Sequence, residues 1–162
     1  MFEFVTNSAK ETEKLGEKFA EKIIYGYPKL NQKNSAITLS LEGELGGGKT
    51  TFLKGFAKKL GVKEKIKSPT FIIMRKYQLT TDNKQQITKD RKLKSRFYHF
   101  DCYRIENPEE LLGLGFQEII QNPQNIVAIE WGNKIKKLLP KNYIKIKFEF
   151  LGKEKRGIKI IK

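Results

Sequence analysis

A glycine-rich segment early in the chain carries the residue types that bind phosphate. It matches the pattern G-x-x-x-x-G-K-[ST] in full and reads Gly43-Glu44-Leu45-Gly46-Gly47-Gly48-Lys49-Thr50. Glycines let the backbone turn tightly and bring successive N–H groups toward phosphate oxygens, and a following helix N-terminus adds partial positive charge. Lys49 can reach the β- and γ-phosphates, and the Thr50 hydroxyl can ligate Mg²⁺. The motif therefore predicts a nucleotide-binding loop.

The type of nucleotide follows from a second segment. Guanine-specific P-loop proteins usually carry Asn/Thr-Lys-x-Asp, and the nearest string here, residues 133–136, lacks the aspartate. We therefore expect ATP and Mg²⁺ as cofactors. The expected nucleotide contacts are Leu45, Gly46, Gly47, Gly48, Lys49, Thr50, Thr51 and Asp101.

Two predicted strands end in an acidic residue, and such acids are needed for hydrolysis. One strand leads through residues 97–100 to Asp101, and the other through residues 126–129 to Glu130. Ligands of open α/β sheets lie beyond the carboxyl ends of the strands, so both acids could reach a nucleotide. A carboxylate in this place holds Mg²⁺ or orients the attacking water. Which acid orients the water stays open.

Three other features have two interpretations each. His99 is the only histidine and is either packed in its strand or an acid–base group. Trp131 either stacks on a base or fills the core. Ser68-Pro69-Thr70 is either a switch-like loop near the γ-phosphate or an ordinary turn.

The elements that must position these residues alternate along the chain. Hydrophobic spacing predicts a helix over residues 8–26, with a capping box from Ser8 to Glu11. A second helix is predicted over residues 49–60, between the glycine-rich segment and Gly61, and a third over residues 108–120, with Pro108 in its first turn. Strands are predicted at residues 36–41, 71–77, 97–103, 126–129, and in a C-terminal hairpin of residues 143–150 and 158–160. This order predicts an α/β P-loop NTPase fold with a central, mostly parallel sheet and few helices. Residues 1–162 would form a single P-loop ATPase domain.

Composition limits the class of protein. The chain has 162 residues, one cysteine, and a net charge of +15 from 33 basic and 18 acidic residues. No run of about 18 apolar residues could span a bilayer, and residues 1–4 do not begin a signal peptide, so we expect a cytoplasmic protein. The positive charge is explained equally well by a nucleic-acid-binding surface and by lysine-rich composition.

Taken together, these segments resemble the bacterial TsaE family, the ATPases required for threonylcarbamoyladenosine modification of tRNA. The resemblance covers about residues 36–132 in order and spacing. The matching stretches are residues 43–52, Ser68-Pro69-Thr70-Phe71, Tyr98-His99-Phe100-Asp101-Cys102-Tyr103-Arg104, Pro108-Glu109-Glu110 with Leu114-Gly115, and Ile129-Glu130-Trp131.

The resemblance implies a subunit that hydrolyses ATP, weakly when alone. It would reset a complex with the TsaB and TsaD proteins, which modify adenosine 37 of ANN-decoding tRNAs. By motif, Lys49, Asp101 and Glu130 would serve catalysis, and Thr50 and Glu130 would hold Mg²⁺. The basic segment of residues 79–96 is longer than is usual in the family, so the resemblance gives no guide to it; it would contact a partner or tRNA, or form only an expanded surface loop.

The alternative function is a small-molecule or nucleotide kinase with the same loop. Such an enzyme needs a lid and an acceptor pocket, which the strand-rich remainder of the chain does not offer. A nucleic-acid-binding protein is a third class, but no RNA-binding aromatic motif or helix-turn-helix is visible in the sequence.

Overall fold

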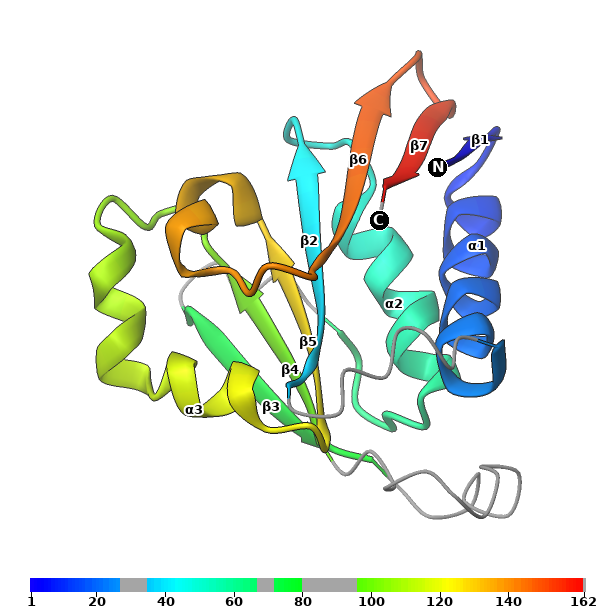
Figure 1. Ribbon diagram of the computed structural model, residues 1–162. Helices are drawn as coiled ribbons and strands as arrows, with labels where there is room; N and C mark the ends of the chain where they lie inside the picture. Colours follow the sequence, from blue (N-terminus) through cyan, green and yellow to red (C-terminus); the bar gives the residue numbers. More distant parts are fainter. Residues whose placement is uncertain (27–34, 67–71, 80–95, 162) are drawn as a thin grey trace.

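One mixed sheet runs through the molecule, with helices on both of its faces (Figure 1). The computed structural model describes residues 1–26, 35–66, 72–79 and 96–161. The sheet has seven strands in the order β1-β7-β6-β2-β5-β4-β3. Their bounds are β1 Phe2–Thr6, β2 Ile37–Gly43, β3 Met74–Gln78, β4 Arg96–Asp101, β5 Asn125–Glu130, β6 Ile144–Phe150 and β7 Arg156–Ile161.

The four central strands are parallel and the flanking strands are not. Three pairings are parallel, β2–β5, β2–β6 and β4–β5, and three are antiparallel, β1–β7, β6–β7 and β3–β4. The expected C-terminal hairpin is confirmed as β6–β7, but a mostly parallel sheet is not confirmed. The sheet has more antiparallel pairings than predicted, because an unpredicted strand, β1, joins the hairpin and β3 pairs with β4.

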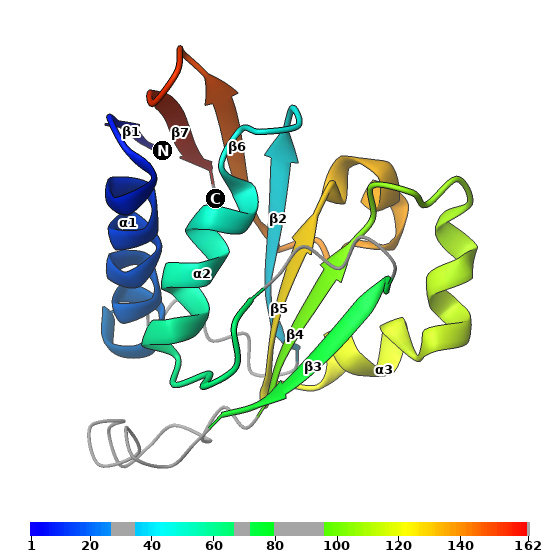
Figure 2. The same ribbon diagram turned by 180° about the vertical axis from the view of Figure 1, so that it is seen from behind.

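Helices cover the two faces unequally. On one face, α1 (Ala9–Glu21) and α2 (Lys49–Lys59) pack side by side, and α1 continues as the π-helical segment η1 (Lys22–Gly26). The other face carries α3 (Phe116–Gln121) and the 3₁₀ segments η4 (Pro108–Leu114) and η5 (Gly132–Leu138). Figure 2 shows α1 and α2 together, away from α3. No described helix is long and apolar enough to cross a membrane.

Strand alternation divides the core into two clusters. Along β5, Ile126 and Ala128 join the cluster under α1 and α2, whereas Val127 and Ile129 join the cluster under α3. Side chains of a strand point alternately to opposite faces, so a strand covered on both faces is apolar throughout. This pattern explains the continuous apolar run that predicted β5, and it brings the chain to Glu130 at the strand's carboxyl end.

Two expected helices differ in detail. The segment predicted as one helix over residues 108–120 is a 3₁₀ segment followed by α3, because Gly115 adopts a left-handed conformation (φ 72°) between them. At α1, Ser8 Oγ accepts the Glu11 N–H at 3.1 Å, but Glu11 Oε2 accepts the N–H of Asn7 at 2.8 Å, so the reciprocal bond is displaced by one residue. Ser68-Pro69-Thr70 and residues 80–95 lie outside the described residues.

Candidate functional site

The glycine-rich loop connects β2 to α2, as the motif predicts. Two of its glycines are required by the backbone. Gly43 has φ 141°, and a Cβ there would lie 2.2 Å from the carbonyl oxygen of Phe148. Gly48 is the N-cap of α2 with φ 99°, in the left-handed region that favours glycine. The loop can therefore fold back against β6 and enter the helix in a tight turn.

Several backbone N–H groups at the start of α2 make no hydrogen bond within the described part of the chain. The N–H of Gly47 donates to Glu44 O at 3.1 Å, and that of Phe52 donates to Gly48 O at 2.9 Å. The N–H groups of the residues between them, 48–51, have no acceptor among the described residues. A helix leaves its first N–H groups without intrahelical partners, and these groups bind anions. The arrangement fits a phosphate group.

Backbone carbonyls at the start of the glycine-rich loop hold the side chain of Lys49, the first residue of α2. Its side chain is buried, and Nζ donates to Gly43 O at 2.8 Å and to Glu44 O at 2.7 Å. The same Nζ lies 4.0 Å from the centroid of the Trp131 ring. Burial lowers the pKa of Lys49, while the charges of Glu130 and Asp101 act to raise it. The Lys49 ammonium is thus held by two carbonyl acceptors, which phosphate oxygens could replace.

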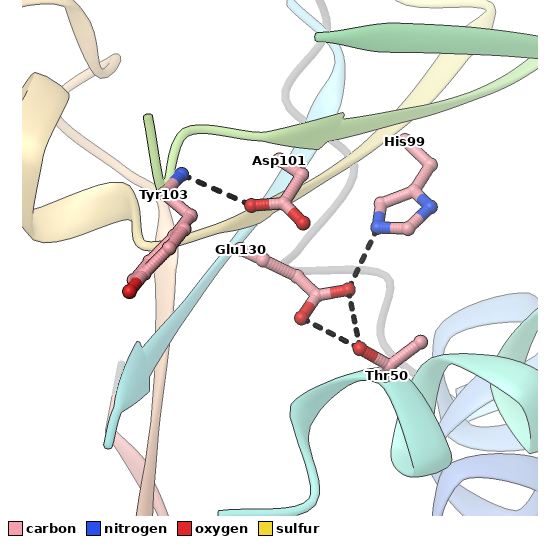
Figure 3. Close-up of polar contacts among 5 residues, drawn as sticks. All are labelled: Thr50, His99, Asp101, Tyr103 and Glu130. Atoms are coloured by element: carbon pink, nitrogen blue, oxygen red, sulfur yellow. Dashed lines mark hydrogen bonds and ion pairs between the residues drawn. The ribbon is translucent and has the colours of Figure 1, made fainter. Parts of the chain in front are cut away.

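Glu130 and Thr50 form the second part of the site (Figure 3). The Thr50 hydroxyl lies 2.9 Å from both Glu130 Oε1 and Oε2. Glu130 is 2% exposed, and its Oε1 also lies 2.9 Å from Nε2 of His99, which is wholly buried. The carboxylate at the end of β5 is thus directed at the first turn of α2.

Asp101 lies on the neighbouring strand beside Glu130. The two residues are register partners in the β4–β5 pairing, so they reach the same edge of the sheet. Asp101 Oδ1 accepts the N–H of Tyr103 at 3.0 Å. This contact turns the chain after the strand, and it explains why β4 ends at Asp101 and not at Tyr103 as predicted.

Oxygen atoms of Thr50 and Glu130 fit a magnesium ion. Mg²⁺ prefers oxygen ligands, keeps several waters, and is usually bound through one or two carboxylates and substrate phosphates. No group of three or more His, Cys, Asp or Glu residues suited to a metal occurs among the described residues. A cation held here would therefore take most of its ligands from water and nucleotide, as Mg²⁺ does.

All predicted site residues line one pocket of about 800 Å³. Its wall includes the loop residues 45–51, Asp101 and Glu130, which come from three segments of the chain. Other lining residues were not predicted as site residues, although two of them, Tyr103 and Glu110, belong to the stretches that carry the family resemblance. They are Ala9, Thr12, Ile72, Ile73, Tyr103, Ile105, Glu110, Lys153, Glu154 and Arg156.

Arg156, a lining residue that was not predicted, makes several hydrogen bonds to backbone carbonyls. Its Nε donates to Gly46 O in the loop at 2.9 Å, and its Nη1 donates to Gly152 O at 3.0 Å and Lys155 O at 2.8 Å. The guanidinium also lies over the Phe150 ring, 4.5 Å from its centroid. Arg156 therefore joins the β6–β7 turn to the glycine-rich loop. In the sequence it is one of many basic residues, and no local signal distinguishes it.

Trp131 also has a conformation that the sequence does not reveal. It is the only described residue other than glycine with positive φ (60°), and its N–H donates to Leu41 O at 2.8 Å. Its ring contacts that of Tyr103, with 5.1 Å between centroids. A tryptophan whose backbone adopts the left-handed conformation is uncommon. The turn places the indole over Lys49, in the wall of the pocket.

Comparison with known proteins shows which family the chain resembles along most of its length. A profile of the family described as "Threonylcarbamoyl adenosine biosynthesis protein TsaE" matches residues 6–158. The TsaE protein of Rickettsia typhi is 35% identical over 93% of this chain and 88% of its own length. The TsaE protein of Haemophilus influenzae is 32% identical over 91% of this chain and 81% of its own length.

A solved structure has a similar fold. The crystal structure of Bacillus subtilis YdiB superimposes with a TM-score of 0.61 and 25% identity, covering 97% of this chain and 82% of that one. The chain belongs to the TsaE family of threonylcarbamoyladenosine biosynthesis proteins. The resemblance seen in the sequence is confirmed.

Proposed function

We propose that this chain is a P-loop ATPase that serves threonylcarbamoyladenosine modification of tRNA. The observation that carries the proposal is the convergence of Lys49 and Thr50, at the start of α2, with Glu130 at the end of β5. The Thr50 hydroxyl and both Glu130 carboxylate oxygens lie 2.9 Å apart although 80 residues separate them. Family membership supports the biological context.

Each residue has a defined task in this proposal. The N–H groups of residues 48–51 and the Lys49 ammonium hold the phosphates of ATP and stabilise the charge that develops on them. Thr50 and Glu130 hold Mg²⁺, which neutralises phosphate charge when it is bound. Asp101, beside Glu130, orients the attacking water. Leu45 and Thr51 line the same pocket and contact the nucleotide.

In this proposal water accepts the phosphoryl group, so no second substrate is phosphorylated and the energy of hydrolysis serves an assembly. We propose TsaB and TsaD as partners, with hydrolysis resetting their complex between rounds of modification at adenosine 37 of ANN-decoding tRNAs. Activity of the isolated chain is then weak. The tRNA substrate implies a cytoplasmic location, and residues 79–96 are the candidate for a direct tRNA contact.

An ATPase assay with and without TsaB and TsaD tests the proposal. We expect weak hydrolysis by the wild type, stimulation by the partners, and losses on the order of 10- to 100-fold in Lys49→Ala and Glu130→Ala, because each removes a charged contact. Lys58→Ala is the matched control, since Lys58 is exposed on the same helix and pairs with Glu17.

Two outcomes would contradict the proposal. One is a pair of site variants that hydrolyse ATP as well as the Lys58 control. The other is full activity without partners on a small-molecule acceptor, which would favour the kinase.

A further inference from the structure

His99 is a buried polar residue that the proposed chemistry does not yet use. It lies on β4 between Phe97 and Phe100, two side chains that are wholly buried, and its own ring is 0% exposed. It is the only histidine in the chain. Burying an imidazole costs free energy unless its polar atoms are satisfied. The contact that it makes should therefore explain its presence.

That contact is to Glu130. His99 Nε2 lies 2.9 Å from Glu130 Oε1, and Figure 3 shows the ring directed at the carboxylate from the side opposite Thr50. The register of β4 against β5 explains why the His99 side chain reaches Glu130. His99 pairs with Ala128 and Asp101 with Glu130, so positions 99 and 101 project to the same face of the sheet as position 130.

Hydrogen-bond geometry determines which ring nitrogen donates. An ionised carboxylate only accepts hydrogen bonds, so Nε2 carries the proton in its bond to Glu130. His99 Nδ1 is buried with no hydrogen-bond partner among the described residues. A proton on Nδ1 would be an unsatisfied buried donor, whereas a bare lone pair costs less. The tautomer with hydrogen on Nε2 therefore fits both environments: Nε2 donates to Glu130, and Nδ1 carries no hydrogen that lacks an acceptor.

We propose that His99 is a positioning residue for Glu130. Its Nε2–H holds Oε1 in place, so that the carboxylate faces Thr50 and the cation that the two residues would share. Residues in this role orient metal ligands and typically change metal affinity or activity by about 10- to 100-fold when removed. The inference rests on the proposed function, since it assigns His99 to the same site.

The test uses three variants and the native reporter Trp131, the only tryptophan. Its indole lines the pocket over Lys49. His99→Gln can place an amide N–H near the position of Nε2, whereas His99→Asn places its amide only near Nδ1, and His99→Leu has no donor. Mg²⁺ is titrated at fixed concentration of a non-hydrolysable ATP analogue, and Trp131 fluorescence gives the Mg²⁺ midpoint. Thermal melting of each variant reports structural damage separately.

We expect the Mg²⁺ midpoint to rise about 10- to 100-fold in the Asn and Leu variants and to return close to wild type in the Gln variant. A second readout does not depend on the nucleotide. Protein with ¹⁵N-labelled histidine shows a single imidazole, and its spectrum should report a protonated Nε2 that shifts in Glu130→Gln.

Different results separate the two proposals. If the wild type shows Mg²⁺-dependent binding and all three variants share its midpoint, or if Nδ1 carries the proton, the role of His99 is overturned while the ATPase proposal stands. If the wild type shows no Mg²⁺-dependent nucleotide binding, both proposals fail.

Discussion

At the residue scale, the side chains of the site satisfy one another before any ligand arrives. Lys49 uses two loop carbonyls, and Thr50 uses the carboxylate of Glu130. Bound phosphates would compete with the carbonyls of Gly43 and Glu44 for the lysine. The exchange replaces neutral acceptors with charged ones, so the ammonium gains an opposite charge in addition to its hydrogen bonds. The loop therefore keeps the Lys49 ammonium hydrogen-bonded and can also accept an anion.

Cys102, next to Asp101, gives a residue-scale prediction on pH. Burial raises the pKa of its thiol to about 12, with a smaller contribution from the Asp101 charge, from an ordinary value of 9.0. Between these values the unfolded chain releases a proton that the folded chain keeps, so stability falls as pH rises. Urea unfolding at pH 8, 9 and 10 should show this loss.

Cys102→Ala is the control, because it removes the titrating group. The difference in unfolding free energy between wild type and variant should change with pH above about 9 and stay constant below it. A thiol reagent should also react with the wild type far more slowly at pH 8 when it is folded than in urea. Rapid reaction of the native thiol would contradict the prediction.

At the element scale, the C-terminal hairpin contributes to the site through its turn. Arg156 ties the glycine-rich loop to that turn, and Lys153 and Glu154 from the turn line the pocket. A planar guanidinium suits this role, since its five donors lie in a fixed fork. An element far from the motif in sequence thereby helps to fix the shape of the loop.

Replacing Arg156 should therefore loosen the loop. We expect Arg156→Ala to weaken binding of the ATP analogue about 3- to 10-fold through the lost hydrogen bonds. Arg156→Lys should not restore affinity, because an ammonium cannot span the same carbonyls. Lys155→Ala, an exposed neighbour in the same turn, is the control. Recovery of affinity in Arg156→Lys would show that charge, and not the fork, is what the loop needs.

At the scale of the whole molecule, close packing of α1 on α2 seats the loop against the sheet. A Cβ at Gly16 would lie 2.1 Å from Phe52 O, and one at Gly55 would lie 1.9 Å from Glu13 O. Phe52 and Phe56 of α2 pack against Phe19 of α1, with ring centroids 5.9 and 6.2 Å apart. The glycines allow the two helices to approach until their backbones touch.

Alanine at either glycine should destabilise the fold. Alanine favours a helix by about 1 kcal/mol over glycine, but the clash with rigid backbone costs about 1–3 kcal/mol or more. We therefore expect Gly16→Ala and Gly55→Ala to lower Tm by several degrees in thermal melts. Gly113→Ala is the control, since nothing lies within 4 Å of its Cβ position. An unchanged Tm at Gly16 and Gly55 would mean that the helices can move apart.

The sequence by itself determined the local features of this protein. Glycines and Lys49 identified the loop and the start of α2, and apolar runs located β2 and β5, because backbone sterics and side-chain alternation act within a few residues. The same runs placed an acid at the end of β5. They did not reveal β1 or the break at Gly115, where a short strand and a single left-handed glycine leave a weak pattern.

Tertiary structure alone decided how those features meet. The bond from Thr50 to Glu130 spans 80 residues, and that from Arg156 to Gly46 spans 110. The contact of His99 with Glu130 depends on the register of β4 against β5. Strand order and register follow from the packing of all layers together, and a single strand's pattern does not encode its neighbours. The sequence therefore indicated which residues could act, and the fold determined their partners.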